Sequence, residues 1–307
     1  MNHATPRVHT AHSATAVGVT AVILWSSLAL LTTLTEGIPP FELMALGFGI
    51  AFVASALILG RRGLAGFSSW RQPWGVWASG FAGIFVYHAL YFFALKAAPA
   101  AEASLINYLW PLLLVLLSAL AAGEKLHKRQ MLGALSGLAG TAFIMQQHAP
   151  QPGAAMPVAG YLAAFGCALI WAGYSVFNRR YSAVPSSTIG GICGLVAVAG
   201  LICHLLFETT VRPDLHQWAA IIVLGLGPVG LAFLAWDHAT KHGNLATLGA
   251  LSYLAPLIST VLLIATGRSQ AGPILIVAAL LIIIGAVIAT SRSSEKPATT
   301  RSIIPNE

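Results

Sequence analysis

Charged residues are scarce in this chain of 307 residues: Asp, Glu, Lys and Arg together make up only 8% of it. An ordinary soluble domain carries about 25% of such residues. Hydrophobic residues, in contrast, reach 57%. A chain with so few charges cannot cover a soluble fold with a charged surface, so we predict an integral membrane protein whose surroundings are the lipid bilayer.

Cysteine is also scarce, and its spacing excludes several kinds of site. The three cysteines all lie in apolar stretches without a CxxC spacing: Cys167, Cys193 and Cys203. An odd number in such positions does not indicate a disulfide framework or a zinc site. His238 and His242 are four residues apart beside Asp237, a spacing that can ligate a metal, but no third ligand accompanies them. We therefore expect no metal and no cofactor.

Motifs for catalysis and for nucleic-acid binding are missing as well. The sequence contains no GxSxG elbow, no HExxH and no phosphate loop, which argues against an enzyme. The formal net charge of +7 comes from basic residues that stand singly or in small groups between apolar stretches. This pattern is typical of the cytoplasmic loops of membrane proteins, so we predict no binding to nucleic acid.

What the sequence has in quantity is long apolar segments. A helix needs about 20 mostly apolar residues to cross a bilayer. Ten segments meet this length, and the joints between them are too short for a soluble domain: 16–35, 41–60, 74–95, 100–122, 130–147, 158–178, 188–207, 217–237, 245–266 and 273–291. The sequence thus predicts an all-α membrane protein with ten transmembrane helices and two short tails, 1–15 and 292–307.

Two of these regions resemble each other. Residues 94–112 align without a gap on residues 239–257, at an offset of 145, with seven identities in nineteen positions. This predicts two five-helix repeats, 16–147 and 158–291. Because five is an odd number, the second repeat would be inverted relative to the first. A chain that contains both halves is expected to work as a monomer.

The distribution of positive charge predicts the orientation. With both termini in the cytoplasm, only Lys96, Arg212 and Arg268 of the sixteen Lys and Arg residues face outward. The other thirteen, Lys241 among them, fall in cytoplasmic loops and tails, as the positive-inside rule requires. We therefore place both termini in the cytoplasm.

Polar and aromatic side chains deep within the apolar segments are the candidate substrate-binding residues. Hydrocarbon tolerates such groups mainly where they line a pathway or bond to one another. The candidates are Tyr87, His88, Tyr91, Asn107, Tyr108, Trp110, Trp171, Tyr174 and Tyr253. They form either a cavity that stacks flat, moderately polar molecules or a packed, hydrogen-bonded interior, and spacing alone leaves both interpretations open.

Prolines and glycines inside the segments are candidates for hinges, because proline removes a backbone hydrogen bond and can kink a helix. The candidate gating or hinge residues are Lys96, Pro111, Gly227, Pro228 and Pro256. The nine acidic residues are all assigned to helix ends, loops or tails, which leaves His88 as the titratable residue within the predicted cavity. We therefore predict facilitated transport without an obligatory ion.

These features together resemble the EamA family of the drug/metabolite transporter superfamily. The resemblance rests on the two halves and on the pattern that precedes Pro111 and Pro256. It also rests on the dipeptide Leu24-Trp25 in the first predicted helix, to which Ile170-Trp171 in the sixth corresponds. Within that family, residues 87–113 are most similar to the aromatic amino acid exporters of the YddG type.

The resemblance implies a basket of ten helices around a central cavity. It implies export of aromatic amino acids across the bacterial inner membrane by alternating access. The cavity wall would then include Tyr87, His88, Tyr91, Tyr108, Trp110 and Trp171. A broad-specificity drug or metabolite exporter of the same fold, and a membrane scaffold or sensor without flux, are the alternatives.

Overall fold

The computed structural model describes residues 6–123, 127–146, 157–268 and 272–290, and these residues form helices and short joints without a strand. The predicted all-α membrane protein is therefore confirmed. Eight stretches of the described chain are long and apolar enough to cross a membrane: Ala11–Leu34, Pro40–Gly60, Trp74–Ala97, Glu102–Ala122, Val158–Tyr181, Thr188–Phe207, Leu215–His242 and Leu245–Ala265. Of the predicted tails 1–15 and 292–307, residues 1–5 and the whole of 292–307 lie outside the described residues, and residues 6–15 are part of a helix.

The helices follow the apolar segments closely. The first half contains α1 (Pro6–Ser26), α2 (Leu28–Leu34), α3 (Pro40–Gly60), η1 (Leu64–Trp70), α4 (Trp74–Phe81), η2 (Ala82–Val86), α5 (Tyr87–Ala97), α6 (Ala100–Asn107), α7 (Trp110–Ala122) and α8 (Lys128–Gln146). The second half contains α9 (Val158–Phe177), η3 (Asn178–Tyr181), α10 (Thr188–Phe207), α11 (Leu215–Leu224), η4 (Gly225–Leu231), α12 (Ala232–His242), α13 (Leu245–Ser252), α14 (Leu254–Ala265) and α15 (Pro273–Thr290).

Several spans are interrupted where the sequence predicts a continuous helix. α6 ends and α7 begins around Tyr108, and α13 and α14 are separated at Tyr253, which stands 145 residues later. Pro111 and Pro256 lie in the first turns of α7 and α14, where a missing N–H is tolerated. η2 and η4 are wide π-helical turns that join α4 to α5 and α11 to α12.

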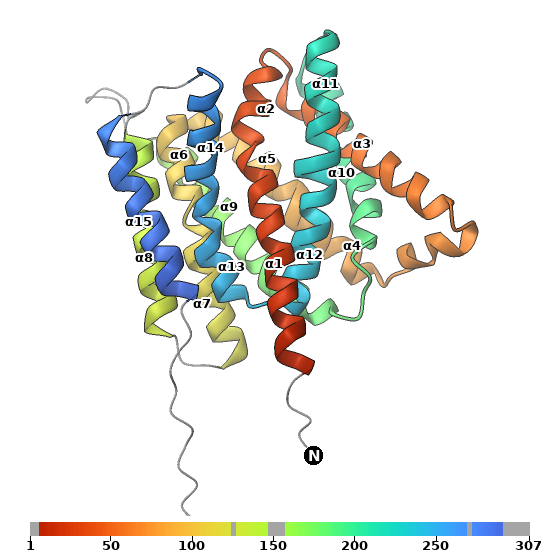
Figure 1. The fold of residues 1–307 in the computed structure, drawn as a ribbon. Helices are drawn as coiled ribbons and strands as arrows, with labels where there is room; N and C mark the ends of the chain where they lie inside the picture. The colour runs from red at the N-terminus through yellow and green to blue at the C-terminus, as the bar shows by residue number, and fades with distance from the viewer. Residues whose placement is uncertain (1–5, 124–126, 147–156, 269–271, 291–307) are drawn as a thin grey trace, which may run out of the picture.

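The packing of the helices is visible in Figure 1. α8 and α15 pack along each other at one flank, and α3, packed on α10, extends toward the opposite flank, with α1 and α12 between them. The contact between α8 and α15 is close because Gly285 has no side chain: a Cβ there would lie 2.6 Å from the backbone oxygen of Gly133. Small residues bring membrane helices together in this way.

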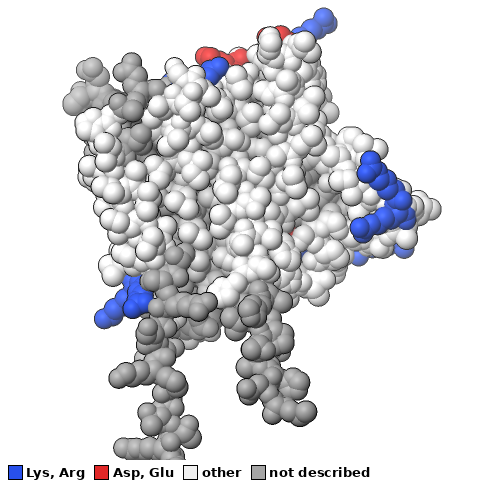
Figure 2. All heavy atoms as spheres, viewed as in Figure 1, with Lys and Arg blue, Asp and Glu red and all other residues white. Residues whose placement is uncertain are grey.

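Charges lie where a bilayer allows them. In Figure 2 the charged side chains gather at the two ends and one edge of the visible face, and the broad band between them is almost entirely uncharged. At one end, the Glu208 carboxylate accepts hydrogen bonds from the backbone N–H groups of Phe41 and Glu42 at the start of α3. His204 bonds to the same carboxylate at 3.0 Å.

The end of the eighth predicted segment differs from the structure, with consequences for two charged residues. The predicted helix 217–237 continues as α12 to His242. Lys241 is therefore helical and 7% exposed, and Asp237, in the middle of α12, is 3% exposed. The assignments of Lys241 to a loop and of Asp237 to a helix end are wrong, because hydropathy drops at these charges although the helix and its burial continue.

Candidate substrate site

A ladder of hydrogen bonds connects α5 to α6 in the first half. Asn107 donates from Nδ2 to the Tyr87 hydroxyl at 3.0 Å, and the hydroxyls of Tyr91 and Ser104 are 3.0 Å apart. Tyr87 and Tyr91 lie one helical turn apart on the same face, and their rings stack with centroids 6.0 Å apart. The two helices therefore face each other through these four side chains.

Aromatic rings from five helices gather around Trp171 of α9. Its ring centroid lies 5.6 Å from Trp25, 5.6 Å from Tyr87, 6.4 Å from Trp110, 5.6 Å from Tyr174 and 6.1 Å from Trp236. We call these residues, together with Tyr91, the aromatic cluster. Trp25 and Trp236 join it from α1 and α12, which sequence spacing within one segment could not show.

The two added tryptophans are held by hydrogen bonds to the backbone and to a hydroxyl. Trp25 donates its indole N–H to the carbonyl of Pro228 at 2.9 Å, and Trp236 donates to the Ser175 hydroxyl at 3.0 Å. Gly227 and Pro228 lie in the π-helical turn η4. The candidate hinge is therefore bonded directly to the aromatic cluster.

His88 lies beside the cluster but is fixed in place. Its Nδ1 is 2.7 Å from the carbonyl oxygen of Ile84, and because a carbonyl only accepts, Nδ1 carries the proton. The imidazole ring packs edge-on against Phe48 at 5.4 Å and also contacts Phe92 and Phe233. This arrangement suits a hydrogen-bonded fixture better than a proton carrier.

Asn107 holds a polar atom without a partner. Its Oδ1 is buried and accepts no hydrogen bond, alone among the buried side-chain polar atoms of the described residues. A buried acceptor in this condition costs about 1–3 kcal/mol. Because Nδ2 of the same amide already bonds to Tyr87, the free oxygen lies at the edge of the aromatic cluster. Such an atom is suited to receive a donor from a ligand.

The other predicted residues lie elsewhere. Tyr108 is half-buried and, through its carbonyl, accepts a 3.2 Å hydrogen bond from the Tyr253 hydroxyl. Tyr253 itself is fully buried in a separate apolar group with Val115 and Leu257, so the structure does not bring it to the aromatic cluster. Lys96 is exposed at the end of α5.

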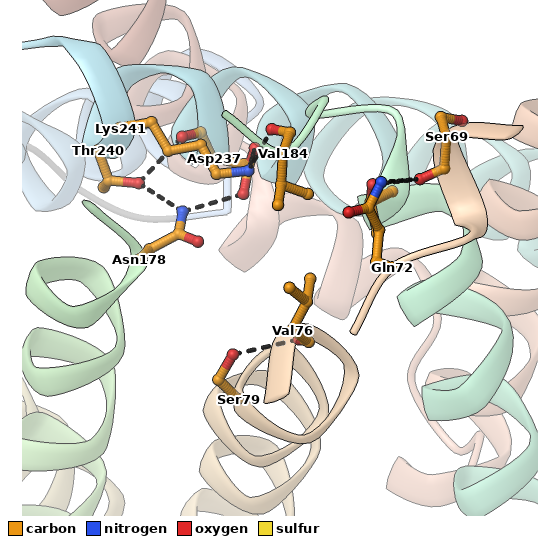
Figure 3. A network of polar contacts seen from close by, with 10 residues as sticks. Ser69, Gln72, Val76, Ser79, Asn178, Val184, Asp237, Thr240 and Lys241 are labelled. Atoms are coloured by element: carbon orange, nitrogen blue, oxygen red, sulfur yellow. Dashed lines mark hydrogen bonds and ion pairs between the residues drawn. The ribbon is translucent and has the colours of Figure 1, made fainter. Parts of the chain in front are cut away.

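Figure 3 shows a polar network that the candidate residues of the sequence do not include. Lys241 donates to the Asp237 carboxylate at 2.7 Å and to the carbonyl of Val184 at 3.0 Å. Asn178 donates to Asp237 at 2.9 Å and to the Thr240 hydroxyl at 3.0 Å. We call these five residues the polar network. The spacing of four residues between Asp237 and Lys241 is the one signal that could have indicated it.

The polar network joins two helices at one end of the protein. Asn178 and the neighbouring Arg179 belong to η3, which follows α9, and Arg179 donates to the carbonyls of Thr240 and Gly243 at the end of α12. A water-sized cavity of about 10 Å³ borders the network and reaches Tyr174 of the aromatic cluster. The polar network and the aromatic cluster are therefore neighbours.

The described residues contain no group of three or more His, Cys, Asp and Glu side chains that could hold a metal ion. His238 and His242 are exposed, and their ring centroids are 4.9 Å apart.

Comparison with known proteins identifies the family. The chain matches the EamA-like transporter family twice, over residues 12–146 and 158–291. The chain belongs to this family. It is therefore a multi-pass membrane transporter and not an enzyme.

Named relatives cover most of this EamA-family chain. It is 48% identical over 282 residues to the aromatic amino acid exporter YddG of Ancylobacter novellus, with 91% of this chain and 97% of that protein covered. Its identity to the aromatic amino acid exporter YddG of Escherichia coli is 26% over 269 residues, which cover 82% and 88% of the two chains. A solved crystal structure superposes with a TM-score of 0.86 at 47% identity and covers 91% of this chain and 96% of the other.

Proposed function

We propose that this transporter exports aromatic amino acids and that the aromatic cluster is its binding site. The observation that carries the proposal is the pairing of stacked rings with one unpartnered acceptor, Asn107 Oδ1. Aromatic side chains of a solute stack on such rings, and an ammonium group is attracted to their faces. The ammonium group would donate a hydrogen bond to Asn107 Oδ1. The 48% identity to a named aromatic amino acid exporter supports the same substrate class.

We further propose that ten helices form two inverted five-helix halves, with α8 and α15 as the last helix of each. Two hydrogen bonds connect residues 145 positions apart, the offset of the sequence repeat: Tyr253 to Tyr108 and Ser136 to Leu281. Bonds between equivalent positions are expected next to a pseudo-twofold axis. The wide turns η2 and η4 interrupt corresponding spans of the two halves in the same way. Inverted repeats of this kind support alternating access.

The polar network supports a proposal about which end is closed. Its bonds hold α9 and η3 against α12 at the end of α12 where Lys241 lies. Toward the end where Lys96 lies, the cluster members Tyr87 and Tyr91 are only half-buried, so the cluster is less covered there. We place the Lys241 end and both termini in the cytoplasm, in accord with the positive-inside rule, so this conformation faces outward.

The proposal is tested by counterflow of labelled phenylalanine in proteoliposomes. Trp171→Ala removes the ring at the centre of the cluster, and Asn107→Leu removes the free acceptor, so both are expected to reduce flux at least tenfold. Trp218→Ala and Tyr253→Phe are the matched controls, since Trp218 and Tyr253 lie outside the cluster, and they should retain flux. Full activity of both cluster variants, with normal expression, would place the substrate elsewhere.

The same assay separates the alternative functions. Equal flux of several unrelated aromatic cations would indicate a broad drug or metabolite exporter, and no flux of any solute would indicate a scaffold or sensor. We propose a facilitated monomer. Uphill accumulation driven by a pH gradient and abolished by His88→Asn or Asp237→Asn would contradict uncoupled transport, and activity confined to a dimer would contradict the monomer.

A further inference from the structure

A second cavity lies on the outer side of Tyr174, a member of the aromatic cluster, between α4, η2 and α9. Its volume is about 320 Å³, and it is lined by Ser79, Ala82, Gly83, Val86, Ile170, Gly173, Tyr174 and Phe177. We call it the lateral groove. Ala82, Val86 and Phe177 are exposed, although all three lie within candidate membrane spans. An exposed residue within a span faces lipid, so the groove opens sideways into the bilayer.

Two glycines and a wide turn produce the groove. Gly173 faces open space, since a Cβ at that position would meet no atom within 4 Å. Gly83 lets the backbone of η2 approach the ring of Tyr174, because a Cβ there would lie 2.4 Å from Tyr174 Cγ. The π-helical turn η2 widens the α4–α5 span at this level. Tyr174 forms the floor of the groove and is itself 8% exposed.

A positive charge stands at one end of the lateral groove. Ile170, Gly173 and Phe177 follow one face of α9, and Arg180 continues that face into η3. The guanidinium carbon of Arg180 lies 5.0 Å from the centroid of the Phe177 ring, and the side chain of Arg180 is exposed. The lateral groove is largely apolar and ends at an arginine, so its shape and charge are complementary to a ligand with an acyl chain and an anionic head group.

We propose that the lateral groove binds one acyl chain of an anionic phospholipid and that Arg180 binds its phosphate. The planar guanidinium group suits phosphate oxygens, and basic sites at the cytoplasmic ends of membrane helices bind anionic head groups. The acyl chain would pack on one face of Tyr174, whose ring also contacts Trp171 at 5.6 Å. A bound lipid would thus support the back of the aromatic cluster. The lipid site does not depend on which solute is transported.

The test is native mass spectrometry of the full chain in detergent micelles with phosphatidylglycerol or phosphatidylcholine of identical acyl chains. The protein is expected to retain phosphatidylglycerol preferentially. Arg180→Gln should weaken that retention about fivefold, since one basic residue near an anionic lipid contributes about 1 kcal/mol. Gly173→Leu should reduce retention of both lipids, because its side chain occupies the groove. Arg62→Gln, which changes an exposed arginine that does not line the groove, is the matched charge control and should change nothing.

Three results would overturn the proposal. The first is equal retention of the two lipids by the unmodified protein. The second is an effect of Arg62→Gln as large as that of Arg180→Gln. The third is a Gly173→Leu protein that keeps its lipid but loses phenylalanine efflux, which would make the groove a solute path. Arg180→Gln alters only an exposed side chain, so it provides a folded variant even if Gly173→Leu does not.

Discussion

Lys96 and Lys241 occupy equivalent positions in the sequence repeat, yet their side chains have opposite environments in the structure. Lys96 is exposed at the end of α5, whereas Lys241 is 7% exposed and bonds to Asp237 and to the carbonyl of Val184. Four residues earlier, the first half has Phe92 where the second has Asp237. Phe92 packs edge-on against Phe41 at 5.5 Å. At these equivalent positions the second half thus has charges and hydrogen bonds, and the first half has an apolar contact.

The difference bears on how each end can open. Hydrogen bonds are directional and are lost over a short separation, whereas apolar contacts can slide. Asp237 and Lys241 both belong to α12, so separation of α9 from α12 breaks the bonds of Asn178 but leaves the ion pair intact. This avoids the cost of an unpaired buried charge. The Lys241 end is therefore suited to a two-position gate.

The largest effect is expected from Lys241→Met. It leaves the Asp237 carboxylate buried without its cationic partner. An unpaired buried charge of this kind costs about 3–5 kcal/mol of stability. The apparent Tm in detergent, followed by fluorescence-detected size exclusion, should fall sharply. The double variant Asp237→Asn/Lys241→Met removes both charges and should recover part of the loss. A double variant no more stable than Lys241→Met would show that the charges are not coupled.

Asn178→Ala should have the next largest effect. It removes two hydrogen bonds between η3 and α12, one of them to a carboxylate, and such bonds contribute about 1.5–3 kcal/mol. The probe is Ser79→Cys in a chain without native cysteines, because Ser79 lines the water-sized cavity. In the Asn178→Ala protein, this introduced thiol should react faster with a hydrophilic thiol reagent. An unchanged rate would mean that Asn178 does not hold this end closed.

At the other end, Tyr161→Phe should have a smaller effect. Its hydroxyl donates to the Glu102 carboxylate and so connects α9 to α6, but Tyr161 is only half-buried and water can replace the bond. The fall in apparent Tm should be smaller than that of Asn178→Ala. An equal or larger fall would reverse the contrast between the two ends.

Lys96→Met should have the smallest effect of the series. Replacing an exposed side chain changes the stability of a protein little, so the apparent Tm is expected to stay within the error of the measurement. Its comparison with Lys241→Met is the direct test of the contrast, because the same change is made at equivalent positions. A large fall for Lys96→Met would show that both lysines have structural roles.

Part of the candidate site follows from sequence spacing. Tyr87 and Tyr91 share a helix face, as their spacing of four residues predicts, and Asn107 bonds to Tyr87 from the next helix. Tyr253 does not join them, since it packs between α7, α13 and α15. The partners of a side chain on a buried helix depend on distant segments, and a repeat in sequence does not specify them.

The sequence by itself determined the membrane class and the approximate course of the apolar helices. These follow from a local property, the side-chain hydropathy over about 20 residues, whereas the interruptions near Pro111 and Pro256 appear only in the structure. Only the tertiary structure decided that Trp25 and Trp236 complete the aromatic cluster and that Asp237 and Lys241 are buried. Burial and pairing are set by residues from other helices, because whether a charge meets water or a partner depends on what packs over it.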